Sequence, residues 1–350
     1  MQSFKLYKAG ILMLSLVLAF TIALESYWRS RGFKPSSNDD KVLWASQRKL
    51  LAVSGANTTV FVGGSRIKFD IDLPTWEKIT DEKAIQLAMV ATPGRIILRD
   101  LANDKSFRGK VVVDVMEVQF FSSDTVRRDK FARDALDYYY KETPAQSASA
   151  AINKLLESRL VFLEEGKFGM NELLNGLLVS NRKGVTGKLA FPKEFSSTSA
   201  NRQTSMTPMF LANAGIRKKQ MGLWSKGTLA IAEKAPRFRG DTVEVLLKQI
   251  KQSVDKICAR GGSVIFVRPP SNGPFLEVEN RVFPRHAYWD RLLEFTNAPG
   301  IHFTDYPETS HLVCPEWSHL SPEGARTYTK QLVRILQAEK GWSFSPNISN

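Results

Sequence analysis

Several features that define common protein classes are scarce or absent in this 350-residue sequence. Only two cysteines occur, Cys258 and Cys314, which excludes a disulfide-rich scaffold. In an oxidising compartment the two could pair, and two unpaired buried thiols are the alternative. No cysteine or histidine lies at metal-binding spacing from either of them, so we expect no metal site and no cofactor. Internal repeats and low-complexity tracts are also absent, which excludes a repeat array.

Acidic residues are fewer than basic residues in this sequence. The 49 Lys and Arg residues outnumber the 35 Asp and Glu residues, and the formal net charge is +14. Such a balance favours anionic partners, namely phospholipid headgroups, acidic polysaccharides or nucleic acids. The basic residues are dispersed, and no nucleic-acid-binding signature is present. We therefore expect an envelope surface as the partner, and no nucleic acid.

Long hydrophobic runs are absent except at the N-terminus, where residues 9–24 are apolar and uncharged. Two lysines precede this run, and Glu25-Ser26-Tyr27-Trp28-Arg29 follows it. The run is shorter than the roughly 20 residues of a full membrane span, but the aromatic pair can lie at the interface and extend it. The small-x-small cleavage signature at residues 21–23 is weak. We therefore predict an uncleaved signal anchor over residues 1–28, a single pass through the cell membrane, and a catalytic domain outside the cytoplasm.

Beyond the anchor, composition and periodicity divide the chain into three parts. Residues 29–56 are polar and charged, and predict a stalk with one short helix at about 41–52. Residues 57–340 alternate between buried strands and helices, which predicts a parallel α/β domain, and residues 341–350 form a tail. Strands are expected at 58–62, 84–90, 110–116, 263–267 and 301–303. Helices are expected at about 96–102, 241–258, 285–296 and 322–338, and a polar helical or turn segment is expected at about 74–80.

The alternation stops after the third strand. Residues 121–240 are rich in polar and basic residues, with helical stretches at 131–140, 147–164 and 170–179. Connections of this length are usually functional or form a subdomain. We therefore predict a large insertion after strand three of a five-stranded parallel sheet.

A candidate nucleophile follows the first strand of this domain. Residues 58–62 (Thr-Thr-Val-Phe-Val) are typical of a buried parallel strand, and Gly63-Gly64 then allow a sharp turn. Ser65 comes next, at the carboxyl end of the strand, where open α/β sheets place their ligands. A serine hydroxyl is weakly nucleophilic at neutral pH and needs a general base.

The candidate base lies near the C-terminus. His319 comes just before a strong helix start, in which Ser321 is an N-cap candidate and Pro322 fits the first helical position. Glu316, three residues before the histidine, can orient the ring and stabilise its charged form. Taken singly, a Gly-Gly-Ser turn and a histidine before a helix are more often structural. Their order at opposite ends of an α/β pattern favours catalysis.

This combination resembles the SGNH (GDSL-like) hydrolase superfamily. The resemblance implies a three-layer, flavodoxin-like sandwich with a triad of Ser65, His319 and Glu316. It also implies an oxyanion hole built from the backbone N–H groups of Ser65 and Gly94. The sequence departs from the family in three places: Gly64 replaces the usual Asp before the serine, Glu316 replaces the usual Asp of the triad, and residues 114–117 lack the expected Asn.

The N-terminal anchor narrows the resemblance to membrane-anchored SGNH proteins. These are similar to proteins that assist O-acetylation of envelope polysaccharides and D-alanylation of teichoic acids, beside a membrane-bound O-acyltransferase. The resemblance implies that Ser65 accepts an acyl group and passes it to a hydroxyl of a polysaccharide or glycolipid. Two alternatives remain open: a periplasmic carbohydrate or lipid esterase with the same triad, and an inactive scaffold that keeps the fold.

One further residue follows a strand at the same edge of the sheet. Arg268 comes directly after the strand predicted at 263–267. Its guanidinium could bind a carboxylate or phosphate of the acceptor, or help to stabilise the oxyanion. The alternative is a structural salt bridge.

Overall fold

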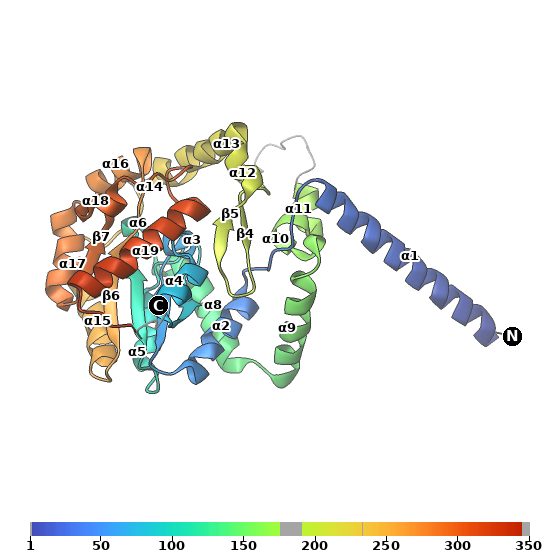
Figure 1. The fold of residues 1–350 in the computed structure, drawn as a ribbon, viewed down its shortest axis with the longest axis horizontal. Coiled ribbons are helices and arrows are strands. Elements are labelled where there is room, and N and C mark those ends of the chain that lie inside the picture. The colour runs from blue at the N-terminus through green and yellow to red at the C-terminus, as the bar shows by residue number, and fades with distance from the viewer. Residues whose placement is uncertain (1, 176–190, 233, 345–350) are drawn as a thin grey trace, which may run out of the picture.

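The computed structural model describes residues 2–175, 191–232 and 234–344, and its central element is a five-stranded parallel sheet (Figure 1). The order of the strands is β2-β1-β3-β6-β7. This confirms the predicted α/β class and the five-stranded parallel sheet. The strands are β1 (Thr58–Val62), β2 (Lys83–Gln86), β3 (Lys110–Asp114), β6 (Ser263–Arg268) and β7 (Gly300–His302).

The strands form where β-branched and aromatic residues follow one another. β1 is buried along its whole length, and β3 and β6 are buried after their first residue. Such continuous burial is expected of strands covered on both faces. The second strand was expected to run to residue 90, and β2 ends at Gln86. The N–H groups of Leu87 and Met89 nevertheless still donate to carbonyls of the β1 segment.

Neighbouring residues of a strand contribute to two different cores, because successive side chains point to opposite faces. Phe61 and Val112 belong to one core, together with side chains of α4 (Leu73–Thr80) and α19 (Pro322–Glu339). Val60 and Val111 belong to the other, together with side chains of α5 (Arg95–Asn103), α15 (Asp241–Cys258) and α17 (Trp289–Thr296). Helices therefore bury apolar surface on both sides of the sheet.

The N-terminal helix α1 (Gln2–Ser30) projects away from the rest of the chain (Figure 1). Its segment Leu6–Ser30 is long and apolar enough to cross a membrane, and none of its most apolar window is buried. It is the one helix with these properties among the residues that the structure describes. A soluble core helix would be buried on at least one face.

The structure differs from the expectation of a stalk over residues 29–56. Helix α2 (Lys41–Ser54) packs on the core, where Trp44 and Ala45 are fully buried. The indole N–H of Trp44 donates to Leu87 O at 3.0 Å. Arg48 forms ion pairs with two carboxylates at the end of α5. Helix α2 is therefore part of the folded domain, because its apolar side meets the sheet.

In the part of the chain between β3 and β6 that the structure describes, there are several helices and one hairpin. The helix expected at 131–140 is α8 (Lys130–Lys141), and the helix expected at 147–164 ends earlier, as α9 (Pro144–Glu157). The third is α11 (Met170–Asn175); residues 176–179 of that prediction lie outside the described residues. Strands β4 (Ser196–Thr198) and β5 (Thr204–Met206) form an antiparallel pair that the sequence did not predict. The other elements are α6 (Glu117–Phe120), α7 (Thr125–Arg128), η1 (Val161–Leu163), α10 (Glu165–Phe168), α12 (Pro208–Ala212), α13 (Ala214–Trp224), η2 (Ser225–Leu229) and α14 (Ala230–Ala232).

The C-terminal third follows the predicted pattern with two additions. The helix expected at 285–296 is divided into η3 (Arg285–Ala287) and α17, and α16 (Gly273–Val282) precedes it. After β7 come η4 (Phe303–Asp305) and α18 (Pro307–Ser310). Cys258 and Cys314 are both free thiols, so they form no disulfide. Of the predicted tail, Trp342 is buried against the core, and residues 345–350 lie outside the described residues.

The burial of α2 leads to a testable prediction. Replacing Trp44 by Ala removes a fully buried indole and its hydrogen bond, and should lower the free energy of unfolding by about 3–5 kcal/mol. Urea denaturation of the detergent-solubilised chain measures this change. The control is Val53→Ala on the same helix, whose side chain is 82% exposed and whose loss should change little. Equal stability of the two variants would contradict the packing of α2 on the core and support the predicted stalk over residues 29–56.

Candidate active site

The turn after β1 presents Ser65 at the first position of helix α3 (Ser65–Asp70). Gly63 has φ of 146°, and a side chain there would overlap Cβ of Asp114 at the end of β3. Gly64 follows in an extended conformation, and its N–H donates to Asp114 Oδ2 at 3.1 Å. The two glycines therefore let the turn press against the neighbouring strand, which places Ser65 at the carboxyl edge of the sheet.

The loop that carries His319 is organised around the carboxylate of Glu316. Trp317 between them has φ of 77°, a left-handed conformation that is uncommon outside glycine. This turn brings the N–H groups of Ser318 and His319 to Glu316 Oε1, at 3.2 and 2.6 Å. The Glu316 carboxylate is thus held by hydrogen bonds from its own loop, independently of its contact with the imidazole ring.

The structure brings together the three residues that the sequence singled out as a triad. His319 Nε2 lies 2.8 Å from Ser65 Oγ, although the residues are 254 positions apart. His319 Nδ1 lies 2.9 Å from Glu316 Oε1. The exposed fractions are 8% for Ser65, 2% for His319 and 0% for Glu316. These contacts suit proton transfer from the hydroxyl to the ring, with the carboxylate facing the opposite nitrogen.

A second contact joins helix α3 to the loop that carries His319. Asp70, at the end of α3, accepts a hydrogen bond from the N–H of Leu320 at 2.8 Å. Burial raises the pKa of Asp70 well above its usual range. Helix α3 therefore contacts the loop at both ends, through Ser65 and through Asp70. This double contact restricts the movement of the serine relative to the ring.

Aromatic side chains surround the imidazole ring. The ring centroids of Phe69, Phe195 and Trp224 lie 4.5, 6.1 and 6.2 Å from that of His319. The indole N–H of Trp224 also donates to Glu316 Oε2. Two of these residues come from the long segment between β3 and β6, and sequence reasoning missed them. No local motif marks them, because the contact depends on how that segment folds back.

Gly94, the predicted second oxyanion donor, lies against the Gly63-Gly64 turn. It has φ of 72° and precedes α5. A methyl group on Gly94 would be 2.8 Å from both Cα and N of Gly63, so the two backbones are in close contact. The structure thus brings Gly94 beside the turn that carries Ser65.

Gln119 is a further polar residue at this turn that sequence reasoning missed. It lies in α6, just after β3, and its side chain is buried. A methyl group on Gly64 would overlap Gln119 Oε1, and this oxygen has no hydrogen-bond partner among the residues that the structure describes. A carboxamide therefore lies against Gly64, the residue just before Ser65.

Arg268, the predicted substrate-binding residue, is buried in an ion network. Its guanidinium donates to Glu117 Oε1 at 3.2 Å, to Ser271 Oγ at 2.8 Å and to Glu279. Arg66, the residue after Ser65, donates to the other oxygen of Glu279 at 2.6 Å. Despite its burial, Glu279 has a lowered pKa because both cations lie beside it. The prediction of substrate binding is therefore replaced by the salt-bridge alternative, since the charge of Arg268 is matched by protein carboxylates.

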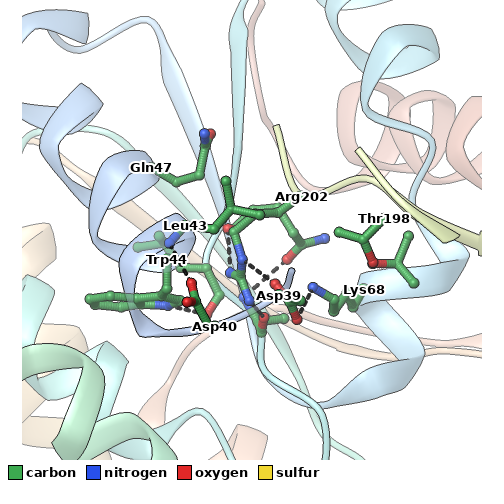
Figure 2. A network of polar contacts seen from close by, with 12 residues as sticks. Asp39, Asp40, Leu43, Trp44, Gln47, Lys68, Thr198 and Arg202 are labelled. Atoms are coloured by element: carbon green, nitrogen blue, oxygen red, sulfur yellow. Dashed lines mark hydrogen bonds and ion pairs between the residues drawn. The ribbon is translucent and has the colours of Figure 1, made fainter. Parts of the chain in front are cut away.

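A second ion network fixes the outer side of α3 (Figure 2). Lys68 donates to Asp39 Oδ2 at 2.5 Å, and Arg202 donates to Asp39 Oδ1 at 2.7 Å. Arg202 also donates to the carbonyls of Gln86 and Ala88 at 2.8 and 2.9 Å. Burial and the nearby Arg202 lower the pKa of Lys68 to about 7. This network joins four separate segments: the chain that follows α1, helix α3, the end of β2 and the β4–β5 hairpin.

Comparison with known proteins does not assign the chain to a family. No protein-family model matches it, and no curated protein matches it. Within the described ranges, no group of three or more His, Cys, Asp or Glu side chains could hold a metal ion. The site is therefore interpreted from its own geometry.

Asp114 gives the site a testable pH dependence. Burial raises its pKa from 3.8 to about 6, so between these values the folded state holds a proton that the unfolded state has released. Its contribution to stability is therefore largest below pH 4 and is lost as the pH rises through 6. Relative to Asp114→Asn, the wild-type free energy of unfolding should fall by on the order of 2 kcal/mol between pH 4 and 6.

Urea denaturation across this pH range provides the measurement. The matched control is Asp134→Asn, which removes a carboxylate that is 49% exposed. The stability difference between the wild type and Asp114→Asn should change with pH more than the difference between the wild type and Asp134→Asn. If Asp114→Asn behaves like this control, the carboxyl group is not held protonated by burial.

Proposed function

We propose that this chain is a membrane-anchored serine acyltransferase of the SGNH type that acts outside the cytoplasm. The observation that carries the proposal is the continuous series of contacts from Ser65 Oγ through His319 to Glu316. In this arrangement Ser65 is the nucleophile, His319 the general base and acid, and Glu316 the residue that orients the ring. An inactive scaffold would have no need to keep the serine within hydrogen-bond distance of the histidine.

The strand order supports the proposed family fold. Counted along the parallel sheet alone, the order is 2-1-3-4-5, which is that of flavodoxin-like, doubly wound proteins. Cores on both sides of the sheet are consistent with three layers. Within this fold, residues 121–240 form an insertion after the third strand. Its residues Phe195 and Trp224 adjoin the triad, so in the proposed enzyme the insertion completes the site.

The proposed reaction proceeds through an acyl-serine. Ser65 Oγ attacks the carbonyl carbon of the acyl donor as His319 Nε2 takes the hydroxyl proton, and Glu316 stabilises the imidazolium. When the tetrahedral intermediate collapses, the bond to the leaving group breaks and His319 returns the proton to that group. An acceptor hydroxyl then attacks the acyl-serine and gives its proton to His319, which passes it to Ser65 Oγ as the ester bond to the enzyme breaks.

The developing negative charge on the carbonyl oxygen needs hydrogen-bond donors. In the proposed site these are the backbone N–H groups of Ser65 and Gly94, as the family resemblance implies. The oxygen of the Gln119 carboxamide lies against Gly64, and in the proposed site its NH2 group supplies the side-chain donor that residues 114–117 lack. Loss of a single donor of this type typically lowers kcat by about 10²–10³-fold.

Transfer is favoured over hydrolysis by the enclosure of the site. Ser65 is almost entirely buried, and aromatic rings surround His319. Such surroundings restrict access of water to an acyl-enzyme. The apolar helix α1 supports a position beside a membrane-bound O-acyltransferase that delivers an acyl group, proposed to be acetyl, to the outer face. The acceptor is then a hydroxyl of an envelope polysaccharide or glycolipid. The periplasmic esterase alternative uses the same triad with water as acceptor.

Separate Ser65→Ala and His319→Ala variants test the triad. Each should lower turnover of an activated acetyl ester by about 10³-fold or more, because removing either member disables the unit. Matched controls are Ser123→Ala and His311→Ala, whose side chains are exposed and should be dispensable. Circular dichroism verifies folding. When an oligosaccharide is added as the acceptor, transfer yields acetylated sugar and hydrolysis yields free acetate, so the two reactions are distinguished by their products. Normal turnover in both triad variants would contradict the triad and support the alternative of an inactive scaffold.

Trp224→Phe tests the role of the insertion. The phenyl ring keeps most of the packing but removes the N–H that donates to Glu316 Oε2, leaving part of a buried carboxylate unsatisfied. We expect kcat to fall about 10- to 100-fold with little change in KM, because a charged hydrogen bond is worth about 1.5–3 kcal/mol. Steady-state kinetics measure both constants. The control is Trp342→Phe, a buried tryptophan outside the site. An unchanged kcat in Trp224→Phe would remove Trp224 from the catalytic arrangement.

A further inference from the structure

The domain-proximal end of α1 is bound to the segment around η1. The Glu25 carboxylate accepts hydrogen bonds from the backbone N–H groups of Val161, at 2.8 Å, and Phe162, at 3.4 Å. Arg29 forms an ion pair with Glu25 at 2.6 Å and donates to Arg159 O at 2.7 Å. Polar contacts therefore join the last turns of α1 to residues 159–162.

Aromatic contacts reinforce this junction. The ring of Trp28 lies 5.7 Å from that of Phe33 and 4.4 Å from that of Phe168 in α10. The ammonium group of Lys193 lies 5.2 Å from the centre of the Trp28 ring. Helix α1 is thus held against the domain at one corner. A membrane that contains α1 must have its surface close to that corner.

Helix α9 ends at the same corner and is polar on the side that contacts the domain. Ser147 accepts a hydrogen bond from Lys49 in α2 at 3.3 Å. Glu157 accepts from the backbone N–H and the side chain of Asn38, at 3.0 and 2.9 Å. No residue of α9 is buried. At both of these positions the helix contacts the rest of the protein through polar groups.

The opposite face of α9 is apolar and exposed. The side chains of Ile152, Leu155 and Leu156 are 61%, 56% and 42% exposed, and Ala145 and Ala148 extend the same stripe. Their spacing of three, four, three and one residues places them on one side of a helix. A surface helix in water has the reverse arrangement, with its apolar stripe toward the core. This stripe therefore leaves an apolar surface that suits an apolar partner outside the domain.

We propose that α9 is a second membrane contact, lying in the interface of the bilayer that α1 spans. Residues 158–160 connect α9 directly to η1, which binds α1, and the two helices diverge from this corner (Figure 1). The exposed Lys154 and Arg159 lie at the same end and suit anionic headgroups. The inference rests on the proposed role of α1 as the membrane anchor.

Two contacts restrict the domain more than one anchor does. A single helix leaves the domain free to rotate about the helix axis, whereas an interfacial helix beside it fixes one side toward the lipid. The site, which belongs to the same packed unit, is then kept at one height and orientation above the membrane. Such a constraint suits an enzyme that receives its acyl group at the membrane surface.

Nitroxide labels on the full-length chain in anionic lipid vesicles test this proposal. Labels are placed at Ile152→Cys and Leu155→Cys, after the exposed native thiol is removed by Cys258→Ser. Collision with oxygen, which concentrates in lipid, is compared with collision with a water-soluble nickel complex. Leu16→Cys within α1 is the lipid-exposed reference, and Val245→Cys, an exposed position on α15, is the water-exposed reference.

The expected result is that both α9 labels resemble Leu16→Cys. Their ratio of oxygen collision rate to nickel collision rate should be at least several-fold higher than the same ratio at Val245→Cys. Labels at α9 that resemble Val245→Cys would overturn the proposal. Labels shielded from both reagents would also overturn it, because they would indicate a protein partner in place of lipid. If Leu16→Cys is itself exposed to water, the membrane anchor fails, and with it the basis of the inference. The triad variants remain a separate test of catalysis.

Discussion

The carboxylate of Glu316 is the group on which the geometry of the site depends. One oxygen accepts hydrogen bonds from the N–H groups of Ser318 and His319 and faces the His319 ring. The other accepts from Trp224, in the long segment between β3 and β6. A fully buried carboxylate is costly unless donors surround it, so the loop, the ring and this segment adopt mutually dependent positions. The longer arm of Glu compared with Asp is accommodated because both of its oxygens have partners.

The position of Ser65 is determined with similar redundancy. Asp114 accepts from the N–H of Gly64 just before it, and Asp70 ties the far end of its helix to the histidine loop. Lys68, one turn along the same helix, joins Asp39 and Arg202 (Figure 2). A serine held by contacts before, within and after its helix loses little further freedom on reaction. This preorganisation is what the proposed acyl transfer requires.

Features encoded by neighbouring residues could be predicted from the sequence, and features that depend on tertiary contacts could not. β1 was predicted residue for residue because its β-branched run suits a fully buried strand. Ser65 and His319 were found because a glycine turn and a helix start mark them locally. The burial of α2 was missed because a single tryptophan in a polar stretch does not reveal its partner. Gln119 and Trp224 carry no local signal. The residues around Arg268 do not reveal the carboxylates that neutralise it, because these carboxylates lie more than ten positions away in the sequence.

Covalent labelling of the full-length chain by an activated acyl or phosphonyl ester tests the central claim most directly. Peptide mapping by mass spectrometry locates the adduct, and its rate of formation is compared between the wild type and His319→Ala. We expect an adduct on Ser65 that forms rapidly in the wild type and far more slowly in His319→Ala. An adduct on another residue, or equal rates in the two proteins, would contradict a serine activated by His319 and Glu316.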